Sequence, residues 1–202
     1  MPYKRRRPAS APDSVRAEFD EIVASVTPGH ARTLNAVLDW AIAETRADFG
    51  NIQLVHPRDG SLRIVAQRGL PAPFLQFFRI VKNDMSLCAH AMKKAVQVVV
   101  PDVTTSRLFS ESARRTMLES EALAVQSTPI LSSDGCVLGV LSTHYRRPKR
   151  STERQLRRIA EMAVYVGELL ERHRLAVSTN VDIHALLDEI RDGSPKTKTI
   201  RG

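Results

Sequence analysis

Polar side chains that could bind a small molecule are spread through an apolar stretch between Ala122 and Tyr145, ALAVQSTPILSSDGCVLGVLSTHY. The stretch reads as two strands around a turn with Asp134-Gly135 at its tip. An unpaired buried donor or acceptor costs about 1–3 kcal/mol, so these side chains need partners. A cavity that holds a polar ligand or ordered water would supply them, and so would neighbouring strands. The candidates in this hairpin are Gln126, Thr128, Ser142 and His144.

Three residues outside the hairpin are further candidates for binding a small molecule. Gln53 lies on a strand expected over 49–55, and Cys88 and His90 lie on a short helix expected over 86–94. Cys88 has two interpretations, a thiolate near a helix start or a small buried apolar residue. His90 could ligate a haem iron or contact an anion, but the sequence shows no second ligand. All these assignments rest on alternation, and a slip of one residue moves a side chain to the other face.

Motifs for catalysis and for metal binding are missing. The sequence has no glycine-rich phosphate loop, no His-Glu metal motif and no nucleophile elbow. The expected C-terminal helix also lacks the His-Glu or His-Asp start of a kinase phosphoacceptor helix. We therefore expect no catalytic residues, no metal site and an output that depends on a partner protein.

Composition predicts a soluble cytoplasmic protein with no membrane partner. The 202 residues are 43% hydrophobic and 26% charged, and no apolar run approaches the roughly 18–20 residues of a membrane span. Cys88 and Cys136 are most simply reduced thiols. The net charge of +8 is concentrated in residues 4–7 and 146–150, which could bind nucleic acid or an acidic protein. With no zinc-finger or aromatic RNA-binding motif, the sequence disfavours nucleic acid.

Periodicity predicts an α+β chain that opens and closes with helices. The final long helix begins at Thr152, which forms a capping box with Gln155. The expected divisions are a disordered basic head (1–12), a first helix (13–27), a folded domain (28–176), and a short C-terminal helix with a flexible tail (177–202). The other expected elements are a helix over 30–47, strands over 49–55 and 61–67, an apolar lid over 71–80, a strand over 97–103, a helix over 111–119, and strands over 122–131 and 136–145.

An apolar stripe on the last long helix favours a homodimer. Its residues recur three and four apart, which is the spacing of a coiled-coil seam. The alternative is that the stripe packs on the domain's own sheet. The stripe consists of Leu156, Ile159, Ala163, Val166 and Leu170.

The chain resembles the GAF domain family, the small-molecule sensory modules of bacterial signalling proteins, from about Leu34 to Arg172. The resemblance rests on ADFGNIQLV, DGSLRIVAQRGLPAPFLQFF, AMKKAVQVVVPDVTTSRLF and the STPI–turn–GVLSTHY hairpin with the helix after it. The stretch from ADFG to STHYRRP also resembles GAF segments attached to histidine kinases. The resemblance implies an antiparallel sheet of five or six strands, a helix bundle on one face, and a ligand pocket with its lid on the other.

The branches of this family imply different chemistry. The cyclic-nucleotide signature of the phosphodiesterase branch cannot be placed on this sequence. The phytochrome branch attaches a bilin through a Cys that a His usually follows, whereas Ala89 separates Cys88 from His90 here, so haem and bilin are disfavoured. The free methionine-sulfoxide reductase branch uses a nucleophilic and a resolving Cys, a pattern that Cys88 and Cys136 do not fit. We expect a non-catalytic sensor, with a thiol-dependent redox enzyme and a basic adaptor as alternatives.

Overall fold

An antiparallel sheet of six strands, in the order β3-β2-β1-β6-β5-β4, organises the chain. The computed structural model describes residues 30–56, 59–81 and 95–191, with side chains between residues 32 and 172 of these ranges. The elements are α2 (His30–Thr45), β1 (Phe49–Val55), β2 (Leu62–Arg68), α3 (Ala72–Phe78), β3 (Ile80–Val81), β4 (Val98–Val100), α5 (Glu111–Glu119), β5 (Ala124–Leu131), β6 (Val137–Tyr145) and α6 (Glu153–Arg191).

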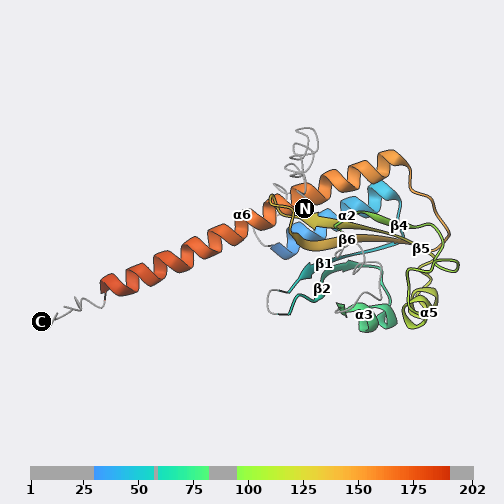
Figure 1. Cartoon of the computed structure of the whole chain (residues 1–202), viewed down its shortest axis with the longest axis horizontal. Coiled ribbons are helices and arrows are strands. Elements are labelled where there is room, and N and C mark those ends of the chain that lie inside the picture. Colours follow the sequence, from blue (N-terminus) through green and yellow to red (C-terminus); the bar gives the residue numbers. More distant parts are fainter. Residues whose placement is uncertain (1–29, 57–58, 82–94, 192–202) are drawn as a thin grey trace, which may run out of the picture.

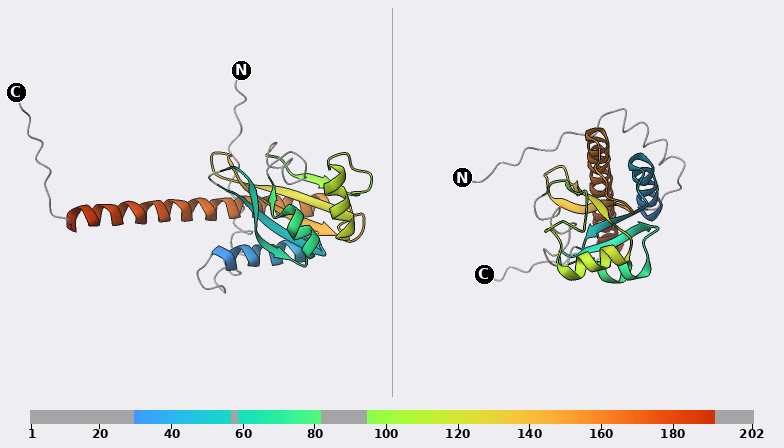
Figure 2. Two further views of the ribbon diagram at one scale, coloured as in Figure 1. Left: turned by 90° about the horizontal axis from the view of Figure 1, so that it is seen from below. Right: turned by 90° about the vertical axis from the view of Figure 1, so that its right-hand side faces the viewer.

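Helices cover both faces of this sheet, and each face has its own apolar core (Figure 1; Figure 2). On one side, which we call the α2/α6 face, Ile52, Ile130 and Leu141 pack against the two long helices. On the other side, the α3/α5 face, Phe49 and Val140 pack with the two shorter helices. The expected α+β architecture, an antiparallel sheet of five or six strands with helices packed on it, is confirmed, and the ligand pocket with its lid on the α3/α5 face stays a prediction.

The element bounds follow the sequence patterns closely, with one strand shorter than expected. β1 and α5 occupy the predicted residues. The strand expected over 97–103 is reduced to β4, because Pro101 has no N–H to donate to a neighbouring strand. The chain then turns at Asp102, whose carboxylate accepts hydrogen bonds from the amide and hydroxyl of Thr104.

Local hydrogen bonds fix where the helices begin. Thr152 and Gln155 form the predicted capping box: the Thr152 amide donates to Gln155 Oε1 at 3.1 Å, and the Gln155 amide donates to Thr152 Oγ1 at 3.2 Å. Ser110 caps α5 in the same way by accepting a hydrogen bond from the amide of Ala113 at 3.1 Å.

The longest helix, α6, is anchored to the β5–β6 turn and then extends past the sheet (Figure 1). Gly167 lies so close to the Leu131 carbonyl that a side chain could not fit between them. Further along α6, the Glu171 carboxylate accepts hydrogen bonds from the amide of Ser133 at 2.9 Å and from its hydroxyl at 3.1 Å. The helix is continuous to Arg191, whereas the sequence predicts a separate short helix after residue 176.

The apolar stripe of α6 packs within its own domain over part of its length. Ile159, Ala163 and Val166 are buried in the core of the α2/α6 face, and Leu170 packs against its edge. These side chains therefore hold α6 on the sheet. The expected homodimer stays a prediction, and the first helix expected over 13–27 lies outside the described residues.

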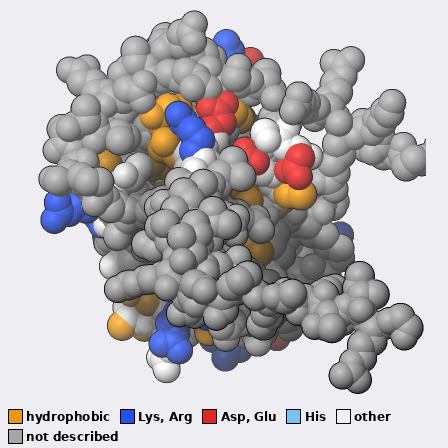
Figure 3. Space-filling view, turned by 90° about the vertical axis from the view of Figure 1, so that its left-hand side faces the viewer, with side chains coloured by type: hydrophobic (Ala, Val, Ile, Leu, Met, Phe, Trp, Pro, Cys, Tyr) orange, Lys and Arg blue, Asp and Glu red, His pale blue; other side chains and the backbone are white. Residues whose placement is uncertain are grey.

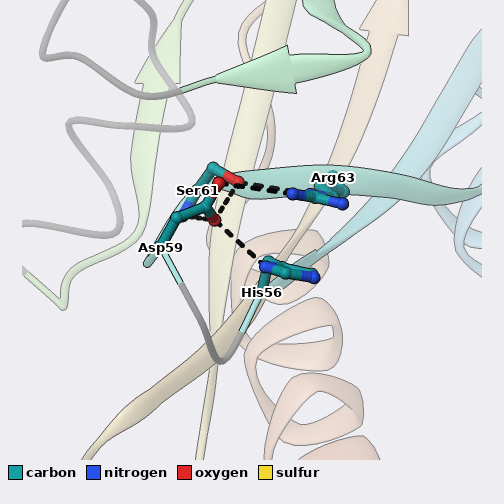
Figure 4. A network of polar contacts seen from close by, with 4 residues as sticks. All are labelled: His56, Asp59, Ser61 and Arg63. Carbon is teal, nitrogen blue, oxygen red and sulfur yellow. Dashed lines mark hydrogen bonds and ion pairs between the residues drawn. The ribbon is translucent and has the colours of Figure 1, made fainter.

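The β1–β2 turn is held by one carboxylate that binds four neighbouring groups (Figure 4). Asp59 Oδ1 accepts hydrogen bonds from the amide and hydroxyl of Ser61 and lies 3.1 Å from Nδ1 of His56. Its Oδ2 lies 3.3 Å from the Arg63 guanidinium. The hydrogen bonds from Ser61, with Arg63 adding to them, hold the pKa of Asp59 well below its usual value. This network closes the hairpin that carries β1 and β2.

Candidate functional site

A row of polar side chains crosses the α3/α5 face of the sheet within its apolar core. Asn51 on β1 pairs with Ser142 on β6, which in turn pairs with Ser127 on β5. Paired residues of antiparallel strands point to the same side of a sheet. All three side chains are buried, and the two serine hydroxyls are 2.8 Å apart. Gln67, which pairs with Asn51 from β2, extends the row to a fourth strand.

His144 lies beside this row, two residues after Ser142 on β6, and is only 2% exposed. Its Nε2 is 2.9 Å from Oδ1 of Asn51, and its ring meets the edge of Phe74 at a centroid distance of 5.1 Å. Within the described part of the chain, Nδ1 has no hydrogen-bond partner. Burial lowers the pKa of His144 to about 3, so the ring is neutral at physiological pH.

Gln53 lies on the opposite side of the row from His144, two residues after Asn51 on β1, and is 1% exposed. Its Nε2 donates a hydrogen bond of 3.0 Å to the carbonyl of Phe78, the last residue of α3. Its Oε1 is without a partner among the described residues. The α3 helix is thus tied to the polar row twice, through the Phe78 carbonyl and through the ring of Phe74.

The remaining predicted residues are not part of this row. Gln126 and Thr128 point to the α2/α6 face: Gln126 contacts Ser151, just before α6, and Thr128 contacts Gln97, which also donates to the Leu156 carbonyl in α6. Ser151 donates to Gln126 Oε1 at 2.8 Å, and Gln97 Nε2 lies 2.8 Å from Thr128 Oγ1. Cys88 and His90 lie outside the described residues. The structure therefore brings Gln53, Ser142 and His144 to one face, and their role in binding a ligand stays a prediction.

Sequence reasoning missed Asn51 and Ser127, which are central to the row. The alternation of β5 places Ser127 on one face and both of its neighbours on the other, so choosing Gln126 and Thr128 selects the wrong partners for Ser142. The register between β5 and β6 shifts between Ile130 and Leu131, and a count from the turn cannot reveal such a bulge. The sequence signal that could have given the correct register is the pairing of Ser127 on β5 with Ser142 on β6.

The surroundings of the row are apolar and carry no buried charge. Among the side chains that the structure describes, no Lys, Arg, Asp or Glu belongs to the buried set. Charged groups lie at the surface beside hydrophobic ones, as the view along α6 shows for one side of the molecule (Figure 3). At the margin of the α3/α5 face, the Arg146 guanidinium lies 4.5 Å from the centre of the Phe49 ring. The row can therefore exchange neutral hydrogen bonds within a water-poor environment.

Two searches of the described residues bear on function. No group of three or more His, Cys, Asp or Glu side chains in the described ranges is arranged to hold a metal ion. No helix in these ranges combines the length and hydropathy of a membrane-spanning segment.

Comparison with known proteins identifies the class of the domain. The chain has the six-stranded α+β fold of small sensory domains, and the profile of the GAF domain family matches residues 30–171. The chain therefore belongs to the GAF domain family. A search of the curated proteins finds no match.

Solved structures share the fold at low sequence identity. The GAF domain of a phosphoenolpyruvate-protein phosphotransferase from Coxiella burnetii has a TM-score of 0.67 and 15% identity, with 81% of this chain and 96% of that chain covered. A domain assigned to a two-component sensor histidine kinase of Sinorhizobium meliloti 1021 has a TM-score of 0.65 and 19% identity, covering 76% and 99%. Free methionine-R-sulfoxide reductase from Neisseria meningitidis, solved with its substrate, has a TM-score of 0.64 and 20% identity, covering 85% and 98%.

Proposed function

We propose that this chain is a non-catalytic sensory domain that binds a small molecule on the α3/α5 face and signals to a partner protein through α6. The observation that carries this proposal is the buried polar row, beside which His144 and Gln53 each keep, inside an apolar core, one atom with no partner among the described residues. Such atoms cost about 1–3 kcal/mol each when they are left unpaired. A bound ligand would remove that cost.

The contacts around the row offer a route for the signal. A ligand on this face would touch α3, because Phe74 and the Phe78 carbonyl already contact the row. It would also touch Ser127, whose neighbours on β5 face the start of α6. A ligand with a higher affinity for one position of β5 would therefore favour one position of α6.

Native mass spectrometry of the full chain, purified from its own host, tests the proposal. We expect a retained small molecule in the wild type and its loss in Ser142→Leu, because a leucine would occupy the centre of the row. Thr128→Val is the matched control, since Thr128 lies on the opposite face of the neighbouring strand. Equal retention by the two variants, or no retained molecule in the wild type, would contradict the assignment.

The second candidate is a thiol-dependent reductase, favoured by the structural similarity to the methionine-R-sulfoxide reductase. Cys136 is exposed beside Asp134 at the β5–β6 turn, away from the polar row, and Cys88 lies outside the described residues. A sulfenic acid formed on one Cys would need a second thiol to resolve it. An assay of methionine sulfoxide turnover with a thiol reductant separates the two candidates, and the sensor predicts no turnover.

A further inference from the structure

We propose that the ligand of this face is recognised through uncharged N–H or O–H groups that donate hydrogen bonds to His144 Nδ1 and Gln53 Oε1. This inference rests on the function proposed above and adds the chemical class of the ligand. It excludes a phosphate or carboxylate as the group that meets these two atoms.

The hydrogen bonds of each residue settle which of its atoms is left over. Phe78 presents a backbone carbonyl, which can only accept, so the Gln53 atom facing it is the amide nitrogen and the leftover atom is the carbonyl oxygen. Asn51 Oδ1 likewise can only accept, so His144 carries its proton on Nε2. His144 Nδ1 then keeps its lone pair. Both leftover atoms are acceptors.

Within the part of the chain that the structure describes, nothing donates a hydrogen bond to these acceptors. Both side chains are at least 98% buried, and neither leftover atom has a partner among the described residues. Gln67 adds a third unpartnered acceptor, its Oε1, next to Asn51 on the same face. Buried acceptors are normally paired, so their occurrence together on one face points to donors that come from outside the chain.

The charge of the surroundings restricts those donors to neutral groups. No Lys, Arg, Asp or Glu among the described side chains is buried on this face, so no buried side chain there would neutralise an anionic or a cationic group. An anionic oxygen would also face the lone pairs of the two acceptors. The rings of Phe74 and Phe78 instead favour an apolar or aromatic body next to the donating groups.

The backbone positions of the two residues indicate the size of a ligand that binds both acceptors. His144 pairs with Phe49, and Gln53 lies four residues further along β1, which is about 13 Å of strand. A ligand with a donor at each end would follow the row across Asn51. A smaller probe would reach one acceptor.

Three probes with similar bodies separate the possibilities: benzamide, N,N-dimethylbenzamide and benzoate. Binding to the full chain would be followed through the ¹⁵N resonances of the His144 ring and the amide signals of β1. We expect benzamide to bind about tenfold more tightly than its dimethyl analogue, because the analogue lacks the N–H donors. Benzoate should bind more weakly than benzamide. Because benzamide is small enough to reach only one acceptor, we expect at least one of His144→Phe and Gln53→Met to reduce the preference for benzamide, and Thr128→Val to keep it.

The outcomes distinguish this inference from the function on which it rests. Equal binding of benzamide and its dimethyl analogue, or tightest binding of benzoate, would overturn the donor class while leaving the site in place if either variant weakens binding. Probe binding that His144→Phe and Gln53→Met leave unchanged, or no binding of any probe, would overturn the site as well.

Discussion

At the residue scale, the buried His144 links stability to pH. Its pKa is about 3 in the folded chain against an ordinary value of 6.5, because burial disfavours the charged ring. Below about pH 6.5 the His144 ring binds a proton in the unfolded state but not in the folded state. The free energy of unfolding therefore falls as the pH falls towards 3. The stabilising effect of a neutral ring is therefore complete only above pH 6.5.

We predict that the wild type loses about 2 kcal/mol more than His144→Phe between about pH 6.5 and pH 5. Urea unfolding of both proteins across that range measures the difference. Carboxylates such as Asp59, whose pKa lies below its usual value of 3.8, change their protonation in more acidic solution and affect both proteins alike. Parallel pH profiles for the two proteins would show that His144 is accessible to protons in the folded chain.

At the element scale, the contact between α6 and the β5–β6 turn depends on the absence of one side chain. In most helices Gly→Ala stabilises by roughly 1 kcal/mol. At Gly167 the added methyl group would overlap the Leu131 carbonyl, which is backbone and cannot rotate away. We predict the opposite sign here, a loss of about 1–3 kcal/mol in the free energy of unfolding. Thermal and urea unfolding measure it, and a stabilised variant would show that α6 does not pack this closely.

The same scale shows what the sequence could and could not predict. Alternation and caps located β1, α5 and the start of α6, because these signals are local. Local signals did not show the faces of the sheet to which the β5 side chains point. They depend on a register that shifts by one residue at Ile130/Leu131, a non-local outcome of packing, so Ser127 was missed and Gln126 was placed with the wrong partners. The continuation of α6 beyond residue 176 was missed because no local signal separates one long helix from two adjoining ones.

At the scale of the whole molecule, we predict a homodimer for the full chain. The helix α6 continues for 20 residues beyond Glu171, about 30 Å, and none of the other described elements lies beside this part of it in Figure 1. Isolated helices are marginal in water and gain most of their stability from packing, so a second copy of the chain is the expected neighbour. Light scattering coupled to size exclusion should give twice the mass of 22.5 kDa. A mass of one chain at every concentration would contradict the dimer.

A helix held firmly at one end and long at the other acts as a lever. The anchor at Gly167 and Glu171 is short, whereas the free arm to Arg191 measures about 30 Å. A tilt of about 5° at the anchor, small enough for packed side chains to absorb, would displace the far end by roughly 3 Å over that length. A movement too small to open the domain would thus be large enough to change what the end of the arm can touch.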